Sequence, residues 1–209
     1  MVKKWMLVLS LFVAPLFAAE VTGLQKVDQV FKRLRTGKGF HARLIKKTHV
    51  SQLDKDSESQ GEIDFSKGKM RLELTKPEKL LLVFNGKVAW QEEEYDDGEK
   101  KTPLVTRMKA QNIKKGSAIL ATLLGNAQVL KTFELVKQDG DHFELKPLNK
   151  KSDVKMLKVD LDGDVLKSVG YVDSLENEVT FKFEHFREDK ISADKFSYKP
   201  PNGAEVNDL

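Results

Sequence analysis

The sequence predicts a mainly β fold of the α+β class, in which an antiparallel sheet curves into a barrel or half-barrel. An N-terminal helix and a short central helix accompany the sheet. About ten short segments alternate apolar and polar residues, and dipeptides typical of hairpin turns separate several of them. Two further apolar segments, one before the first strand and one near the middle of the chain, supply the helices.

Residues 1–19 have the pattern of a secretory signal peptide. Two lysines precede an uncharged stretch, 5–17, that ends in small residues. We expect cleavage just before Glu20 or one residue earlier, which leaves 20–209 as a single exported domain. The alternative is a retained membrane anchor, but the stretch is shorter than the roughly 20 apolar residues that a spanning helix needs.

Composition excludes several classes of protein. The chain has no cysteine, so it forms no disulfide, has no thiolate nucleophile and is not itself a lipid-anchored lipoprotein. Lys and Arg number 36 and Asp and Glu 32, and removing the two signal lysines leaves 34 against 32. The basic residues do not cluster on one periodic face among aromatics, which argues against nucleic-acid binding.

The first helix is predicted to begin at the cap residue Thr22 and to end near Gly37 to Gly39. Its apolar residues recur at helical spacing; they are Leu24, Val27, Val30, Phe31 and Leu34. The central apolar segment, 117–124, lies between two glycines and contributes Ile119, Leu120, Leu123 and Leu124.

The period changes from about 3.6 to 2 at Phe40, which predicts half-buried strands. Hairpin turns are predicted at Asn85-Gly86, of type I′, and at Asp139-Gly140 and Asp162-Gly163, so that the strands follow one another as a meander. A last short strand is expected around Phe196 and Tyr198. One face of the sheet is apolar throughout and the other carries charged residues, as in an antiparallel sheet with one solvated side.

Something must fill the inside of so curved a sheet. Two short helices offer few side chains to cover a large concave surface. Either they pack as an ordinary core, or they leave a cavity that admits a ligand. The residue pattern leaves both readings open.

Two stretches carry a more specific pattern. The first combines a Gly, alternating apolar residues, basic residues, a Pro, an aliphatic strand and a hairpin that ends in Trp; its residues are Gly61, Ile63, Phe65, Lys67, Met70, Arg71, Leu72, Thr75-Lys76-Pro77, Leu80-Leu81-Leu82-Val83, Asn85-Gly86-Lys87 and Trp90. The second is the closing segment 195–206, KFSYKPPNGAEV. In this order, and with the preceding amphipathic helix, they resemble the LolA family, the periplasmic outer-membrane lipoprotein carrier proteins.

The resemblance implies an open, strongly curved half-barrel whose two helices act as a lid over an apolar cavity. It also implies a monomeric, non-enzymatic periplasmic chaperone without a cofactor. Such a protein binds the acyl chains of lipoproteins, receives them from an inner-membrane lipoprotein-releasing ATP-driven transporter and passes them to an outer-membrane receptor. Two alternatives stay open: a related periplasmic lipid- or glycolipid-binding or sensing module on the same scaffold, and a secreted hydrolase.

A carrier of this kind must hide hydrocarbon from water. Exposing one acyl chain of about sixteen carbons costs on the order of 12 kcal/mol, at about 0.8 kcal/mol per methylene. Lid residues that compete for the same cavity would make release possible. The predicted cavity wall is Phe65, Leu72, Leu82, Trp90, Phe143, Leu145, Phe181 and Phe183, and the predicted lid is the two sets of helical apolar residues named above. Each of these positions is equally compatible with a plain core role.

The chain departs from the family at one point. The family places an Arg followed by Pro inside the cavity mouth, where it controls closure, whereas the matching run here is Ser66-Lys67-Gly68-Lys69. Lys67 or Arg71 is the candidate to replace this latch. Lys lacks the planar fork of Arg, however, and the parity of Arg71 predicts that it lies on the outer face.

Other constellations indicate no metal or catalytic site. Asp160, Asp162 and Asp164 lack the terminal Glu of a calcium loop, and the four histidines have no zinc spacing. Ser117 is interpreted as a helix cap rather than a nucleophile. The acidic run 92–97 is expected to be a solvated loop or, alternatively, a docking site for a membrane partner.

Overall fold

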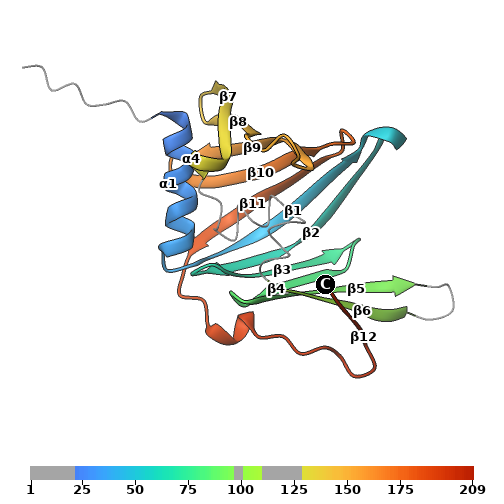
Figure 1. Ribbon diagram of the computed structural model, residues 1–209. Coiled ribbons are helices and arrows are strands. Elements are labelled where there is room, and N and C mark those ends of the chain that lie inside the picture. Colours follow the sequence, from blue (N-terminus) through green and yellow to red (C-terminus); the bar gives the residue numbers. More distant parts are fainter. Residues whose placement is uncertain (1–21, 97–100, 110–128) are drawn as a thin grey trace, which may run out of the picture.

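In the computed structural model, which describes residues 22–96, 101–109 and 129–209, twelve strands form one curved sheet (Figure 1). The strands pair in the order β12-β6-β5-β4-β3-β2-β1-β11-β10-β9-β8-β7. Their bounds are β1 Phe40–Val50, β2 Lys55–Ser66, β3 Lys69–Lys76, β4 Leu80–Phe84, β5 Val88–Asp96, β6 Lys101–Lys109, β7 Phe133–Asp139, β8 His142–Pro147, β9 Val154–Asp162, β10 Val165–Asp173, β11 Glu178–Glu188 and β12 Glu205–Asp208. The predicted signal peptide and the predicted central helix lie outside the described residues.

The sheet consists of two antiparallel meanders, β1 to β6 and β7 to β11, joined where β1 pairs with β11. The prediction of one continuous meander is therefore wrong, because β6 and β7 lie near opposite edges of the sheet. The edge strands β12 and β7 do not pair with each other, so the described sheet is open. A long-range pairing such as β1 with β11 leaves no local signal in the sequence.

Three hairpin turns fall where the dipeptides predicted them, and each contains a glycine with positive φ: Gly86 at +95°, Gly140 at +56° and Gly163 at +58°. The predicted type I′ geometry at Asn85-Gly86 is wrong, since Asn85 is not among the residues with positive φ. Instead, the Asn85 side-chain oxygen accepts hydrogen bonds from the backbone N–H groups of Lys87 and Val88, both at 2.9 Å.

Helix α1, Gly23–Thr36, begins with the predicted cap. The Thr22 hydroxyl accepts a hydrogen bond from the Gln25 backbone N–H at 3.3 Å, and the Gln25 side chain accepts one from the Thr22 N–H at 2.9 Å. Its buried residues include Val27, Val30, Phe31 and Leu34, all on one side. Two single-turn helices are also described: η1, Ser51–Leu53, joins β1 to β2, and α4, Val129–Thr132, precedes β7. Among the described helices, none combines the length and apolarity needed to cross a membrane.

The two faces of the sheet differ in chemistry. Residues directly opposite one another on paired strands lie on the same face, so Phe40, Phe65 and Met70 share one face, called here the inner face. The main apolar cluster lies on this inner face and includes the buried side of α1. The outer face of the central strands carries ion pairs, such as Arg43 with Glu184 at 3.7 Å.

The C-terminal segment covers part of the outer face. It includes the short helix η2, Ala193–Phe196, and strand β12, which pairs parallel with β6. The predicted strand at Phe196 and Tyr198 is therefore wrong: Phe196 ends η2, and the strand forms only after Pro200-Pro201. A parallel edge pairing needs no turn signal next to it, which is why the sequence did not reveal it.

Candidate functional site: an apolar floor beneath helix α1

The candidate site is the apolar part of the inner face, called here the apolar floor. Its centre is aromatic: the Phe40 ring stacks on Phe65 with centroids 5.4 Å apart and on Phe186 at 4.8 Å, and meets Phe183 edge-on at 6.4 Å. These rings come from three neighbouring strands, β2, β1 and β11, which the pairing of β1 with both neighbours brings together. Aliphatic and aromatic residues from β3, β4, β8 and β9 extend the floor on either side; they include Met70, Leu72, Leu74, Leu82, Phe84, Phe143, Leu145, Leu157 and Val159.

Helix α1 covers this floor. In Figure 1 it stands across one end of the strands, and its buried residues belong to the same cluster as the floor. Val27 is 0 % exposed and Phe31 is 1 % exposed. An acyl chain can therefore reach this part of the floor only if α1 moves away.

Polar groups hold α1 mainly along its margins. Lys26 pairs with Asp141 at 2.5 Å, and Arg33 donates to the Asp164 carbonyl at 2.7 Å and lies 3.5 Å from Glu188. These side chains are part-exposed, and exposed ion pairs of this type typically contribute less than about 1 kcal/mol each. Apolar burial therefore dominates the attachment of α1 to the sheet.

The apolar floor ends in a polar rim along β1. From Phe40 to Leu44 the inward residues are fully buried and apolar, but the next inward residue is Lys46. The Lys46 ammonium donates to both Glu78 carboxylate oxygens, at 3.0 and 2.9 Å, and the Ser59 hydroxyl donates to the same carboxylate at 3.2 Å. Sequence reasoning missed this rim, although Lys46 occupies an apolar position of the two-residue pattern.

Seven of the eight predicted wall residues lie on the apolar floor or pack against it, namely Phe65, Leu72, Leu82, Phe143, Leu145, Phe181 and Phe183. Trp90 does not. It pairs across the sheet with Val83, the neighbour of Leu82, and therefore lies on the outer face. There it contacts Tyr198, with ring centroids 5.5 Å apart, and the Arg107 guanidinium, 5.6 Å from its ring. We therefore remove Trp90 from the wall.

The predicted lid is described only in its first half. Val27, Val30, Phe31 and Leu34 are buried against the floor, and Leu24 is partly buried beside them. The second set, Ile119, Leu120, Leu123 and Leu124, lies outside the described residues.

Neither predicted latch residue points into the floor. Lys67 is exposed in the turn between β2 and β3, and Arg71 lies on the outer face, where it donates to Glu73 at 3.0 Å. Among the residues that the structure describes, two guanidinium nitrogens on α1 are buried and have no hydrogen-bond partner, Arg33 Nε and Arg35 Nη1. Buried polar groups are nearly always bonded, and sequence reasoning did not single out these two nitrogens.

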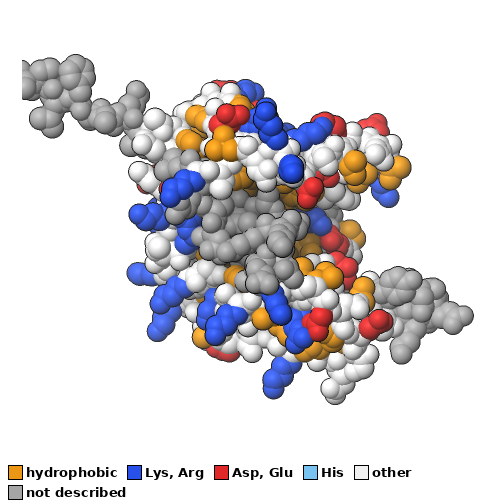
Figure 2. Space-filling model, in the orientation of Figure 1, with side chains coloured by type: hydrophobic (Ala, Val, Ile, Leu, Met, Phe, Trp, Pro, Cys, Tyr) orange, Lys and Arg blue, Asp and Glu red, His pale blue; other side chains and the backbone are white. Residues whose placement is uncertain are grey.

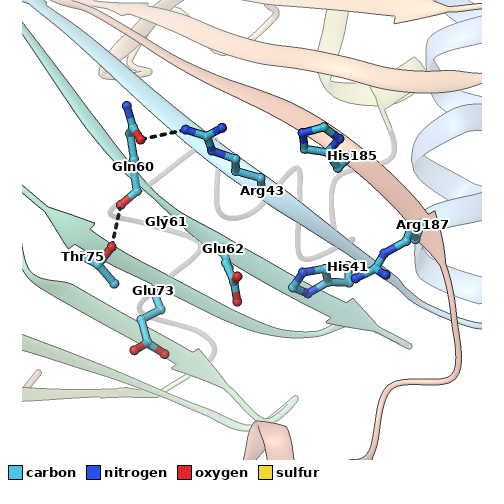
Figure 3. Close-up of a pocket in the computed structure, with 9 residues that line it drawn as sticks. All are labelled: His41, Arg43, Gln60, Gly61, Glu62, Glu73, Thr75, His185 and Arg187. Atoms are coloured by element: carbon cyan, nitrogen blue, oxygen red, sulfur yellow. Dashed lines mark hydrogen bonds between the residues drawn. The ribbon is translucent and has the colours of Figure 1, made fainter.

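A polar pocket on the outer face tests the hydrolase alternative. Figure 3 shows imidazole and guanidinium groups from β1 and β11 on one side of it and carboxylates from β2 and β3 on the other. Its hydroxyl, on Thr75, donates to the Gln60 carbonyl at 3.3 Å, and its His41 bonds to Asp64 at 2.8 Å. The hydroxyl and the imidazole have no bond to each other, so the residues that line this pocket include no activated nucleophile.

A second polar group lies on the outer face of β8 to β10. Ser168 donates to Asp160, and Asp160 also bonds to His142 at 2.6 Å. The hydrogen bond with Asp160 raises the pKa of His142, against the opposing effect of burial. Burial raises the pKa of Asp160, but bonds with Ser168 and His142 outweigh it and leave that pKa lowered. The carboxylate stands between serine and histidine, so the imidazole is not placed to take the serine proton.

Four pockets are bounded by described residues, with volumes of about 430, 300, 940 and 500 Å³, and charged side chains contribute to the lining of each one. The chemistry for holding hydrocarbon lies on the floor that α1 covers.

An open, curved sheet with one helix laid over an apolar inner face defines a class of fold rather than a single protein. The family model described as "Outer membrane lipoprotein carrier protein LolA" matches residues 35–199. The chain belongs to this family.

Individual relatives agree with this assignment. The chain is 28% identical to the outer-membrane lipoprotein carrier protein of Methylibium petroleiphilum, over 90% of this chain and 91% of that protein. It is 30% identical to the protein of the same name from Chromobacterium violaceum, over 75% and 76% of the two chains. An uncharacterized conserved protein from Thermus thermophilus shares the fold, with a TM-score of 0.52, 13% identity and coverage of 88% of this chain and 98% of that one.

Proposed function

We propose that this protein is a periplasmic carrier that binds the acyl chains of lipoproteins on the apolar floor and moves them from the inner to the outer membrane. One observation carries the proposal: a continuous apolar floor is covered by a helix that apolar contacts, rather than backbone hydrogen bonds, attach to the sheet. Membership of the lipoprotein carrier family supports it.

Binding is reversible if the apolar burial of α1 and that of the acyl chain contribute similar free energies. Burying a large apolar side chain contributes about 1.5–3 kcal/mol, so the five apolar side chains of α1 together contribute on the order of 10 kcal/mol. One sixteen-carbon acyl chain returns a similar amount, about 12 kcal/mol. Exchange of α1 for an acyl chain is therefore nearly balanced, which suits a protein that must both accept and release its cargo.

The polar rim gives the bound cargo a direction. Hydrocarbon favours the end of the floor near Phe40 and Phe65, whereas the polar backbone of a lipopeptide favours the end near Lys46 and Glu78. In the same proposal the central segment 117–124 forms the second half of the lid. An inner-membrane ATP-driven transporter supplies the cargo and an outer-membrane receptor accepts it.

Identification of the natural cargo tests the proposal directly. The protein is isolated from the periplasm under mild conditions, and what it holds is determined by mass spectrometry. Co-purified acylated protein supports the carrier. Free lipid or glycolipid without attached protein contradicts it and favours the sensing or binding module, and absence of any acylated species contradicts both.

A pair of variants tests the floor itself. Leu80 lies on the inner face opposite Leu74, and its neighbour Leu81 lies on the outer face opposite Glu73. Both are partly buried on the same strand, so Leu80→Ser and Leu81→Ser make a matched comparison. We expect Leu80→Ser to weaken binding of a fluorescent fatty acid about tenfold, since it removes about 1.5 kcal/mol of apolar contact. Leu81→Ser should bind as the unaltered protein does, and equal losses in the two variants would contradict the proposed site.

The absence of cysteine offers a second readout. A single cysteine introduced at Leu24, on the margin of α1, is the only thiol in the chain and accepts an environment-sensitive dye. Fatty-acid binding should shift the emission toward that of a more solvated dye as α1 moves away. An unchanged spectrum at saturating fatty acid would show that α1 is not the moving part.

A further inference from the structure

A large hollow, called here the lysine pocket, lies at a corner of the molecule, next to the end of the apolar floor at Phe40 and Phe65. Its volume is about 940 Å³, and it lies between the end of α1, the turn that joins β2 to β3 and the segment after β11. The lining includes Lys38, Lys67, Lys69 and Lys190. Figure 2 shows Lys and Arg side chains gathered along α1 and below it, on the same side of the molecule.

The fold brings these lysines together from separate parts of the sequence. Lys38 follows α1, Lys67 and Lys69 flank the β2–β3 turn, and Lys190 follows β11. Lys67 has a φ of +50° and Gly68 one of +72°, so the turn is tight and holds its two lysines close to the hollow. No ammonium group of the four has a hydrogen bond or ion pair to any residue in the described ranges.

The acidic groups of the pocket only partly offset this charge. Glu188 lies 3.5 Å from Arg33 and is compensated by it. Asp189 uses a carboxylate oxygen to accept the Lys190 backbone N–H at 2.6 Å. Four lysines and the one uncompensated carboxylate leave a local net charge of about +3.

Uncharged residues complete the lining. Ile191, Ala193 and Phe196 are its apolar part, and Phe196 is only 3 % exposed. A protein partner would normally find aromatic or Arg anchors at the centre of an interface, where Lys is depleted. Among the described lining residues the one aromatic side chain is buried and none is Arg. Clustered ammonium groups beside partly apolar walls fit instead the phosphates and glycerol backbone of anionic lipids.

We propose that the lysine pocket docks the protein onto an anionic phospholipid surface. Lysine binds phosphate as a point charge and needs no bidentate geometry, so several mobile headgroups can satisfy the four ammonium groups. Docking through this corner would hold the protein at the membrane where cargo is exchanged. Strand β5, which carries Glu92 and Glu93, runs toward the opposite end of the sheet, so repulsion from the membrane favours the same orientation (Figure 1).

Vesicle co-sedimentation tests the proposal with the full mature chain. The vesicles are phosphatidylcholine, either pure or with a quarter of phosphatidylglycerol. We expect binding to the anionic vesicles only, weakening steeply as the salt concentration rises. Each lysine near such a surface typically strengthens binding by about fivefold, so the double variant Lys67→Glu/Lys69→Glu should bind at least tenfold more weakly.

A charge-matched control separates this pocket from net charge. Lys150 and Lys151 are exposed in the loop after β8, and Lys150→Glu/Lys151→Glu changes the total charge by the same amount. The control should retain binding within about twofold. Equal loss in both variants, equal binding to neutral vesicles, or no binding by the unaltered protein would each overturn the proposal. Circular dichroism confirms that the variants fold.

This inference is independent of the carrier function. The lysine pocket and the apolar floor share none of their lining residues. Lys67→Glu/Lys69→Glu should therefore bind the fluorescent fatty acid normally. If the double variant loses vesicle binding and keeps fatty-acid binding, the two properties are separate. If it keeps vesicle binding and loses fatty-acid binding, the substitutions act on the apolar floor, and the proposed role of the lysine pocket is wrong.

Discussion

Two segments cover the same sheet from opposite sides, and they are attached in different ways. Helix α1 covers the inner face through side chains alone, with apolar residues in the middle and part-exposed ion pairs at the margins. The C-terminal segment covers the outer face and adds directional bonds. Strand β12 pairs with β6, Tyr198 donates to Glu92 at 2.6 Å, and Lys195 lies 3.3 Å from the buried Asp64.

This difference indicates that an acyl chain can displace α1, whereas the C-terminal segment stays in place. Apolar contact is non-directional, so an acyl chain can replace the apolar side chains of α1. The bonds of Lys26 and Arg33 that this movement breaks are part-exposed, and water can replace them. Removing the C-terminal segment would break a backbone ladder and leave Asp64 with one partner fewer, at a cost that hydrocarbon cannot repay. The contrast therefore predicts that changes under α1 alter ligand binding, whereas changes under the C-terminal segment alter stability alone.

The largest effect is expected from Phe31→Ala on α1. Phe31 is 1 % exposed, and truncating such a ring costs about 3–4 kcal/mol. The loss falls on the closed state, so the α1 amides should exchange hydrogen at least a hundredfold faster and the fluorescent fatty acid should bind at least tenfold more tightly. Weaker fatty-acid binding would show that Phe31 is part of the site rather than its competitor.

Trp90→Ala should lower the free energy of unfolding by about 2–3 kcal/mol, since it removes the contacts with Tyr198 and Arg107 from a half-buried site. Urea denaturation measures the loss. Fatty-acid affinity should stay within about twofold, because Trp90 lies on the outer face. A large loss of fatty-acid affinity would show that Trp90 belongs to the cavity wall. It would also contradict the proposed difference between α1 and the C-terminal segment.

Tyr198→Phe keeps the ring and removes only the hydrogen bond to Glu92, which should cost about 1 kcal/mol. Burial, and then the bond to Glu92, raise the pKa of Tyr198 well above its usual range. A raised folded-state pKa stabilises the protein fully below the unfolded pKa of about 10, and the benefit is lost as the pH rises through the folded value. The free energy of unfolding should therefore fall as the pH rises above 10, and it should fall less in Tyr198→Phe. Identical pH profiles of the two proteins would exclude the bond.

The smallest effect is expected at His142, which lies on the outer face and is covered neither by α1 nor by the C-terminal segment. Because its folded-state pKa is raised, its contribution is complete below about pH 6.5 and is lost as the pH rises through the folded value. The loss should be under about 1 kcal/mol, since the pair with Asp160 is partly exposed. His142→Gln should remove this part of the pH dependence without changing fatty-acid affinity. If the free energy of unfolding of the unaltered protein rose with pH in this range, the assigned role of His142 would be contradicted.

Much of the apolar floor was predictable from the two-residue period. Met70, Leu72 and Leu74 share a face because alternate side chains on a strand point the same way, and that rule needs no tertiary information. The error at Trp90 arose because the pattern Val88, Trp90 looked continuous with the apolar strand before it. The Asn85-Gly86 hairpin shifts the parity, so Ala89 faces inward and Trp90 outward.

The sequence by itself determined the capped helix, the positions of three hairpin turns and the inward residues of most strands, because each depends on residues a few positions apart. Only the tertiary structure decided that β1 joins the two meanders through β11, that the C-terminal segment returns to cover Trp90, and that four lysines from separate segments surround one hollow. These arrangements join residues far apart in the chain. Their free energy comes from packing and pairing that exist only once the sheet has formed, so no local pattern encodes them.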